Sequence, residues 1–310
     1  MIVCIGNPVY DYIETPQVRT VDRVLSGCAV NAGIVLCRMG YTPVVIYGSV
    51  GPDYQQDMQE RIKAIGGQAI VKSGKSTGGF GLYYDDTGHR TMRILGVANV
   101  LDTQDVERIR PLLTAASFVL LGPILQEISP DFISQVRHIT EAPILLDPQG
   151  CLRRIEGDRV EHFYDKKLDS VLPMVDIIKA NEVETLVMTG FNPRTQGLEA
   201  VWALHSKGCQ IAIVTVAEKG SLICDGKSVY TIPAYAVSAV DPTGAGDTYA
   251  AGIIISILEG IDNWQQRGCF ASAIASMTVE YVAATAPYSW LEVRRRFFAL
   301  VNGGGNQNVE

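Results

Sequence analysis

The sequence has little concentrated positive charge. Lysine and arginine number 26 against 33 aspartate and glutamate residues, which gives a formal net charge of −7, and no long basic run occurs. Nucleic-acid backbones are bound mainly by clustered lysine and arginine side chains. The composition therefore argues against a nucleic-acid partner.

Paired cysteines and clustered histidines are also lacking. The seven cysteines are scattered without a CxxC pair, and an odd number cannot form a complete intrachain disulfide framework. The four histidines are isolated, with no metal-ligand spacing. We expect buried free thiols in a reducing cytoplasm and no zinc site.

No apolar run approaches the ~20 residues that a membrane-spanning helix needs. The most apolar stretch, "AGIIISILEG" over residues 251–260, is too short. The first residues, "MIVCIG", lack a basic start and form too brief a run for a secretory signal. The sequence predicts a soluble, cytoplasmic protein with no membrane partner.

Short apolar runs rich in β-branched residues alternate with helix-period segments along most of the chain. Examples are "VVIYG" at 44–48, "APILLDP" at 142–148 and "VDIIKAN" at 175–181. This alternation predicts βαβ units, hence an α/β fold with a mostly parallel sheet. Ligands of such sheets bind beyond the carboxyl ends of the strands.

Two stretches, 10–25 and 78–95, are mixed polar and β-prone and interrupt this rhythm. They predict strands and hairpins outside the parallel sheet, as a small lid. Neither a proline-rich linker nor an internal repeat is found, so we expect one domain over residues 1–300. The glycine-rich tail 301–310 is predicted to be flexible.

The stretch "DPTGAGDTYAAG" at 241–252 has the composition of an anion-binding loop that opens a helix. Gly244 and Gly246 permit close approach of a ligand, and the amides of Gly244, Ala245 and Gly246 would point at it from a positive helix end. Asp247 would then stand beside the anion. The alternative interpretation is a tight turn in which Asp247 only caps the helix.

An aspartate beside an anion site makes chemical sense in phosphoryl transfer to an alcohol. An unassisted hydroxyl is a poor nucleophile, and a positioned base accelerates its reaction by roughly 10²–10⁴-fold. Two other loops fail as phosphate motifs. "VKSGKSTGG" has Ala69 where the P-loop pattern requires glycine, and "CIGNPVYD" lacks the glycine triplet of a nicotinamide dinucleotide fold.

The stretch at 241–252 closely resembles the C-terminal signature of the ribokinase-like, or PfkB, carbohydrate kinases. "SGCAVNAGIVLCRMG" at 26–40, "IIKANEVETLVMTG" at 177–190 and "IVTVAEKGSLI" at 213–223 resemble other segments of that family in the same order. The likeness extends over residues 1 to 300. It implies a ribokinase-like three-layer fold with a mostly parallel central sheet and a small β lid.

On the donor side, the resemblance implies binding of ATP and Mg²⁺. Asn181 and Glu184 match positions that organise Mg²⁺, largely through water, while Thr215 and Gly220 match nucleotide contacts. Asp241 matches a position that in some relatives belongs to a site for a monovalent cation such as K⁺. Taken alone, Asn181 and Glu184 also fit a helix cap.

On the acceptor side, the resemblance makes Asp247 the catalytic base and residues 244–246 the anion hole. Asp11, Gly27 and Asn31 match positions that bind the substrate. Arg93 and Arg153 offer charge for a phosphorylated sugar, but we interpret them as surface charges or lid contacts.

The resulting prediction is an ATP- and Mg²⁺-dependent kinase that phosphorylates a sugar or polyol hydroxyl. The alternatives are a nucleoside kinase of the same family and a non-catalytic nucleotide- or sugar-binding sensor. A nicotinamide oxidoreductase is a third class. The lid strands present an edge, which allows a homodimer that pairs through the lid.

Overall fold

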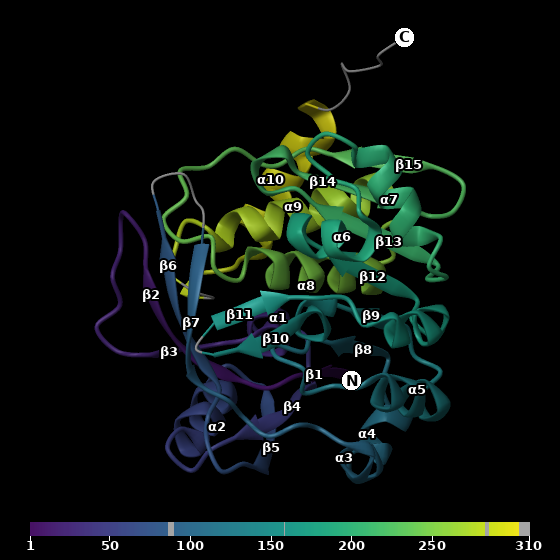
Figure 1. Cartoon of the computed structure of the whole chain (residues 1–310). Coiled ribbons are helices and arrows are strands. Elements are labelled where there is room, and N and C mark those ends of the chain that lie inside the picture. Colours follow the sequence, from purple (N-terminus) through teal and green to yellow (C-terminus); the bar gives the residue numbers. More distant parts are fainter. Residues whose placement is uncertain (86–89, 158, 283–284, 304–310) are drawn as a thin grey trace.

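The computed structural model describes residues 1–85, 90–157, 159–282 and 285–303. In this part of the chain, the central sheet has nine strands (Figure 1). In spatial order they are β15 (Val229–Ile232), β14 (Ser221–Cys224), β13 (Ile211–Thr215), β12 (Ile177–Ala180), β9 (Ile144–Leu146), β8 (Phe118–Leu121), β1 (Ile2–Ile5), β4 (Val44–Val50) and β5 (Gln68–Ser73). All adjacent pairs from β13 to β5 are parallel, and β14 is antiparallel to both neighbours. The predicted mostly parallel sheet is confirmed.

Helices cover both faces of this sheet, because its strands are apolar on both sides. In β1, Ile2 and Cys4 join one core cluster and Val3 and Ile5 join another. The first cluster packs against α1 (Cys28–Arg38), α2 (Gln55–Ala64), α8 (Ala245–Leu258), α9 (Trp264–Thr278) and α10 (Trp290–Gly303). The second packs against α3 (Thr103–Arg108), α4 (Arg110–Thr114), α5 (Pro130–Ile139), α6 (Glu182–Thr189) and α7 (Gly197–His205). The result is a three-layer α/β fold.

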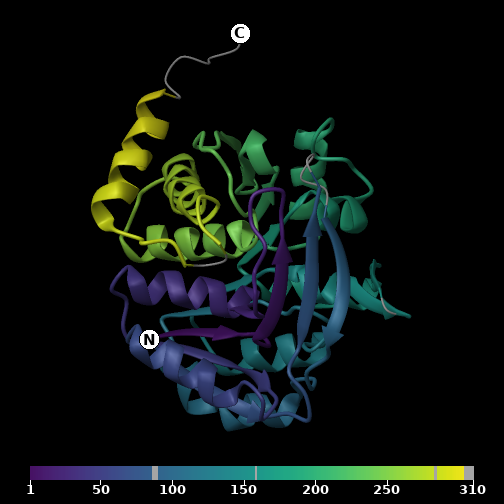
Figure 2. The same cartoon turned by 90° about the vertical axis from the view of Figure 1, so that its left-hand side faces the viewer.

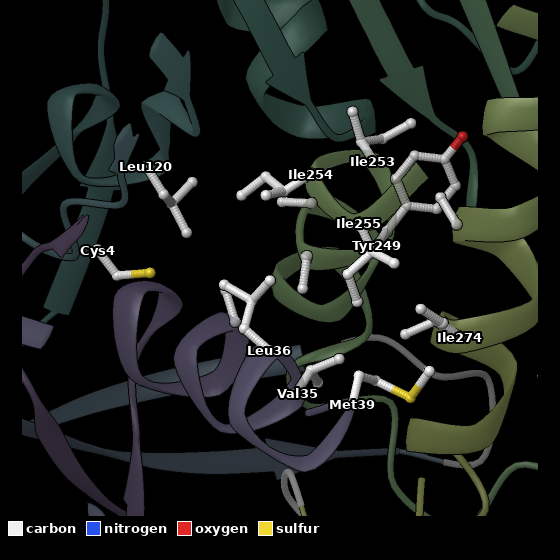
Figure 3. Close-up of a cluster of buried hydrophobic side chains, with 14 of the residues drawn as sticks. Cys4, Val35, Leu36, Met39, Leu120, Tyr249, Ile253, Ile254, Ile255 and Ile274 are labelled. Carbon is white, nitrogen blue, oxygen red and sulfur yellow. The ribbon is translucent and has the colours of Figure 1, made fainter. Parts of the chain in front are cut away.

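Helix α8 lies inside the protein, between α1, α9 and the sheet. An almost uniformly apolar helix is buried on all sides, and residues Thr248–Ser256 of α8 are all buried. Figure 3 shows the cluster to which α1, α8 and α9 contribute, among others, Leu36, Ile253, Ile254, Ile255 and Ile274. This packing fixes the position of the first turn of α8.

A second, six-stranded sheet stands beside the main body (Figure 2). Its order in the described residues is β10 (Arg153–Glu156), β11 (Arg159–His162), β7 (Arg90–Gly96), β6 (Gly79–Tyr84), β2 (Val9–Glu14) and β3 (Val24–Ser26). Strands β2, β3, β6 and β7 coincide with the predicted lid segments 10–25 and 78–95. The segment "DDTG" at 85–88, between β6 and β7, lies mainly outside the described residues.

Strands β10 and β11 extend the lid beyond its predicted limits. Their sequences, "RRIE" and "RVEH", are mostly charged and lack the apolar alternation that identifies a strand. Arg153, predicted to be a surface charge or lid contact, begins β10 but is only 3% exposed. Of the two predicted alternatives, the surface charge is therefore wrong, whereas Arg153 does belong to the lid sheet. Arg93 is exposed, as predicted.

The C-terminal end differs in part from the prediction. Residues 301–303, placed in the flexible tail, complete α10, which ends at Gly303. The remaining residues of the predicted tail lie outside the described part of the chain. Among the described residues, none of the helices combines the length and apolarity required to cross a bilayer.

Candidate active site

The glycine-rich stretch forms a helix start of the predicted kind. Gly244 is the N-cap of α8, with φ of 83°, a left-handed conformation that glycine adopts without strain. Ala245, Gly246 and Asp247 form the first turn, where backbone amides have no partner within the helix and the helix dipole is positive. The Ala245 amide donates a long hydrogen bond, 3.3 Å, to the Pro242 carbonyl. Gly246 and Asp247, for which no such bond occurs among the described residues, therefore offer better-placed donors for an anion than Ala245.

The carboxylate of Asp247 meets the N-terminal half of the chain at this turn. Asn31, buried in α1, donates from Nδ2 to Asp247 Oδ2 at 2.8 Å, although the two residues are 216 positions apart. The Asn31 amide also lies 3.4 Å from Ser26 Oγ. Asp247 itself is half-buried. The structure thus brings together the predicted base and one of the predicted acceptor residues.

Three residues that sequence analysis missed complete this cluster. Asp147 follows β9, Lys179 lies in β12, and Cys28 begins α1. Lys179 Nζ is 2.6 Å from Asp147 Oδ2, and both side chains are at most 3% exposed. The Cys28 sulfur and one carboxylate oxygen each of Asp147 and Asp247 all lie within 4.8 Å of one another.

One sequence signal could have found two of these residues. Asp147 and Lys179 each stand at the carboxyl end of a buried apolar run, where a charge requires an explanation. Because β9 and β12 are neighbouring parallel strands with Ile178 opposite Leu146, the residues that follow are side by side. No comparable sequence pattern marks Cys28 as part of the site.

The cluster is crowded with acidic groups, and burial raises the cost of their charge. Burial first, and then the charge of Asp147, raise the pKa of Asp247, while Lys179, Asn31 and Cys28 oppose the increase. Burial and Asp147 likewise raise the pKa of Glu184 to about 7, with Lys179 acting in the opposite direction. Burial lowers the pKa of Lys179, but the neighbouring carboxylates, Asp147 foremost, outweigh it and raise the pKa overall. Lys179 therefore remains an ammonium ion within the cluster.

Asn181 and Glu184 form a capping box at the start of α6. The Glu184 amide donates to Asn181 Oδ1 at 3.0 Å, and the Asn181 amide donates to Glu184 Oε2 at 2.8 Å. The second carboxylate oxygen accepts from Asn181 Nδ2 at 2.6 Å, and Glu184 is only 1% exposed. Asn181 and Glu184 therefore form the helix cap that the alternative interpretation predicts.

Asp11 and Gly27, also predicted to bind the substrate, lie in or next to the lid. Asp11, in β2, is 3% exposed and accepts a hydrogen bond from the Phe80 amide of β6 at 2.8 Å. Gly27 is the N-cap of α1 with φ of 114°, and a Cβ there would lie 3.0 Å from the Asn7 carbonyl oxygen. Both residues therefore serve to join β2, the lid and α1.

The lid also contacts the loop that precedes α8. Tyr84 of β6 and Thr243 have hydroxyl oxygens 3.1 Å apart, and Thr15 donates from its hydroxyl to the Val240 carbonyl at 3.1 Å. Asp241, fully buried, accepts from the Thr243 amide at 2.8 Å. These contacts place the lid against the glycine-rich stretch.

Thr215 and Gly220 flank the turn between β13 and β14. Gly220 has φ of 89°, and a Cβ there would approach the Ile232 carbonyl oxygen to 1.9 Å, so only glycine fits. The turn reaches α8 through Ser221 and Tyr249, whose hydroxyl oxygens are 2.7 Å apart. This contact connects the turn to Tyr249, in the second turn of α8, rather than to Asp247 itself.

Comparisons with known proteins identify the family of the chain and its relatives. Residues 1–291 match the family model described as pfkB family carbohydrate kinase. The ribokinase of Staphylococcus aureus is 25% identical, with 90% of each chain covered. The nucleoside kinase of Methanothermobacter thermautotrophicus is also 25% identical, over 90% of this chain and 89% of the relative. A solved pyrophosphate-dependent kinase of the ribokinase family superposes with a TM-score of 0.82 at 20% identity, covering 95% of this chain and 99% of the other.

Proposed function

The chain belongs to the pfkB family of carbohydrate kinases, which transfer phosphate to a hydroxyl group, and we propose that it transfers the γ-phosphoryl group of ATP to a sugar or polyol with Asp247 as the base. The observation that carries this proposal is the position of the Asp247 carboxylate. It stands in the first turn of α8, beside the amides of an anion site, and is held at 2.8 Å by Asn31.

In the proposed reaction, the Asp247 carboxylate and the backbone amides of this turn act on different atoms. The acceptor hydroxyl gives its proton to Asp247 as its oxygen attacks phosphorus. The amides of Gly246 and Asp247 stabilise the negative charge of the transferring group, an effect worth about 10²–10³-fold for one donor. Asn31 keeps the carboxylate oriented, since its Nδ2 donates to Oδ2. On the acceptor side, Asp11 and Gly27 belong to the same proposal as substrate-binding residues.

Asn181 and Glu184, the residues predicted to organise the metal, fit a hydrated magnesium ion. Glu184 is a buried carboxylate whose pKa is raised to about 7 by burial and by Asp147, so a nearby cation would favour its ionised form. Magnesium prefers oxygen ligands and keeps several waters, and Asn181 and Glu184 would hold it in that way. When bound, the ion neutralises charge on the donor phosphates. Thr215 and Gly220 as nucleotide contacts, and Asp241 at a K⁺ site, complete this proposal.

A panel assay tests the proposal. ATP consumption is measured with pentoses, hexoses, inositols and nucleosides, each with Mg²⁺ and with EDTA. We expect turnover with a sugar or polyol that EDTA abolishes. Pyrophosphate is included as a second donor, because the structural neighbour named above uses it. A nucleoside as the preferred acceptor would replace the sugar assignment by that of a nucleoside kinase.

Two further outcomes of the panel would reject the kinase assignment. Thermal stabilisation by ligands without any turnover would indicate a binding sensor. A change in NAD(P)H absorbance that is independent of Mg²⁺ would indicate an oxidoreductase.

The pH dependence of kcat/KM should reflect the environment of Asp247. Because burial and Asp147 raise its pKa above the ordinary 3.8, the ionised base is present above that raised pKa and lost as the pH falls through it. We expect an acidic limb above pH 3.8 that Asp147→Asn moves to lower pH, since the substitution removes a charge that raises the pKa. Rate profiles measured from pH 4 to 9 check this. Coincident limbs in the two proteins would remove Asp247 from that role.

A homodimer through the lid is the last part of the proposal. Strands β3 and β10 are the outer strands of the six-stranded sheet, and outer strands offer unpaired backbone groups to a second chain. Sedimentation at assay concentration should show a dimer. A monomer would reject the idea without affecting the proposed chemistry.

A further inference from the structure

A buried ion pair occupies the centre of the site. Lys179 Nζ and Asp147 Oδ2 are 2.6 Å apart, and the side chains are 3% and 2% exposed. They stand at the carboxyl ends of β12 and β9, neighbours in the parallel sheet, where ligands of such sheets bind.

The ammonium group lies where a transferring phosphoryl group would have to be bound. A Cβ added to Gly246 would be 2.9 Å from Lys179 Nζ, so the cation touches the first turn of α8. Asp247, the proposed base, belongs to the same turn. Lys179 therefore lies next to the turn that carries both the proposed base and the amides of the proposed anion site.

Stability alone does not explain such a pair. Desolvation of two buried charges offsets most of their attraction, and replacing both by neutral groups is often without cost. A lysine ammonium has three N–H donors, and the contact with Asp147 uses one of them. The geometry leaves Lys179 able to hold Asp147 while it donates to a phosphate oxygen.

We propose that Lys179 is a catalytic residue that contacts the transferring phosphoryl group together with the Gly246 and Asp247 amides, and that Asp147 is its positioning residue. This inference rests on the proposed phosphoryl transfer at this site. Asp147 fixes the side chain in the absence of a donor, so no reorganisation is needed when the phosphate arrives.

The test separates a catalytic role from a structural one by neutralising the whole pair. Lys179→Met alone leaves Asp147 buried without its cation and should lower the Tm. Combining Lys179→Met with Asp147→Asn removes both charges, so the Tm should recover. We expect kcat of the folded double variant to stay about 10²–10³-fold below wild type. Recovery of kcat to within about 5-fold of wild type would show that the pair is structural and overturn the proposal.

A second pair of the same chemistry provides the matched control. Lys72 Nζ and Asp105 Oδ2 are also 2.6 Å apart, at the end of β5 and in α3, away from the cluster around Asp247. Lys72→Met combined with Asp105→Asn should leave kcat of the folded protein near wild type. A loss of kcat as large as that of the double variant at 179 and 147 would mean that any such substitution inactivates the protein, and would overturn the inference.

Binding of inorganic tripolyphosphate, measured by calorimetry, supplies a readout that does not depend on turnover. The double variant at 179 and 147 should bind tripolyphosphate at least about tenfold more weakly, whereas Asp247→Asn should bind it as well as wild type. Unchanged tripolyphosphate affinity in the double variant would overturn the phosphate contact. If instead Asp247→Asn retained full turnover, the proposed base would fail while the tripolyphosphate result for Lys179 would stand.

Discussion

Asp247→Asn is expected to lower kcat by about 10²-fold or more while donor binding persists. An asparagine has nearly the same shape and keeps an oxygen that can accept the hydrogen bond from Asn31 Nδ2, which spans 2.8 Å in the wild type. It cannot accept a proton from the acceptor hydroxyl. The removal of a negative charge beside the anion site should leave the affinity for ATP unchanged or increase it. Steady-state kinetics and calorimetric titration of ATP measure the two effects separately.

The control for this substitution is a surface aspartate. Asp262 is exposed in the loop before α9, and Asp262→Asn should keep both kcat and ATP affinity. Equal turnover of Asp247→Asn and wild type would show that the base is elsewhere. A joint loss of turnover, ATP binding and folded structure would indicate instead that the carboxylate has only a structural role.

The same turn shows how much of the site the sequence could predict. A local sequence pattern was enough to predict the site where the residues that carry the chemistry and the residues that set the backbone conformation lie in one short segment. Gly244 and Gly246, followed by Asp247 and an apolar helix, predict free amides and a carboxylate at the start of a helix. Helix α8 begins there, and the structure adds that Gly244 is its left-handed N-cap. The alternation of apolar runs likewise predicted the parallel sheet, because strands buried on both faces are apolar throughout.

The long-range contacts of the site could not be predicted in this way. Lys179 meets Asp147 because β12 lies beside β9 in the sheet, and strand order is not encoded in any local pattern. The burial of Arg153 could not be predicted either, since "RRIE" is a polar run of which only the first residue is buried. The partner of Asp247, Asn31, was identified by resemblance to a family, whereas its contact with Asp247 required the structure.

The second substitution with a large expected effect lies below the site, where α8 packs against α9. Helices α8 and α9 cross closely at Gly252, where an added Cβ would lie 2.5 Å from the Ala271 Cα. Backbone cannot move aside as the end of a side chain can, so the helices would have to separate. We expect Gly252→Ala to lower the free energy of unfolding by about 1–3 kcal/mol, even though alanine favours a helix interior by roughly 0.5–1 kcal/mol over glycine. Urea unfolding measures the change.

Gly33→Ala in α1 is the matched control, because it gains the same helix propensity in another buried helix. Its added Cβ would meet the side-chain atoms Cδ1 and Cγ1 of Ile46 at 2.6 and 2.8 Å, so a side chain, rather than the backbone of a neighbouring helix, would have to shift. Gly252→Ala should therefore be the less stable variant. Because the shift of α8 also displaces its first turn, kcat should fall in Gly252→Ala and remain near wild type in Gly33→Ala. Equal unfolding curves for the two variants would mean that the crossing tolerates a methyl group, and that the first turn of α8 is fixed by its own loop contacts rather than by α9.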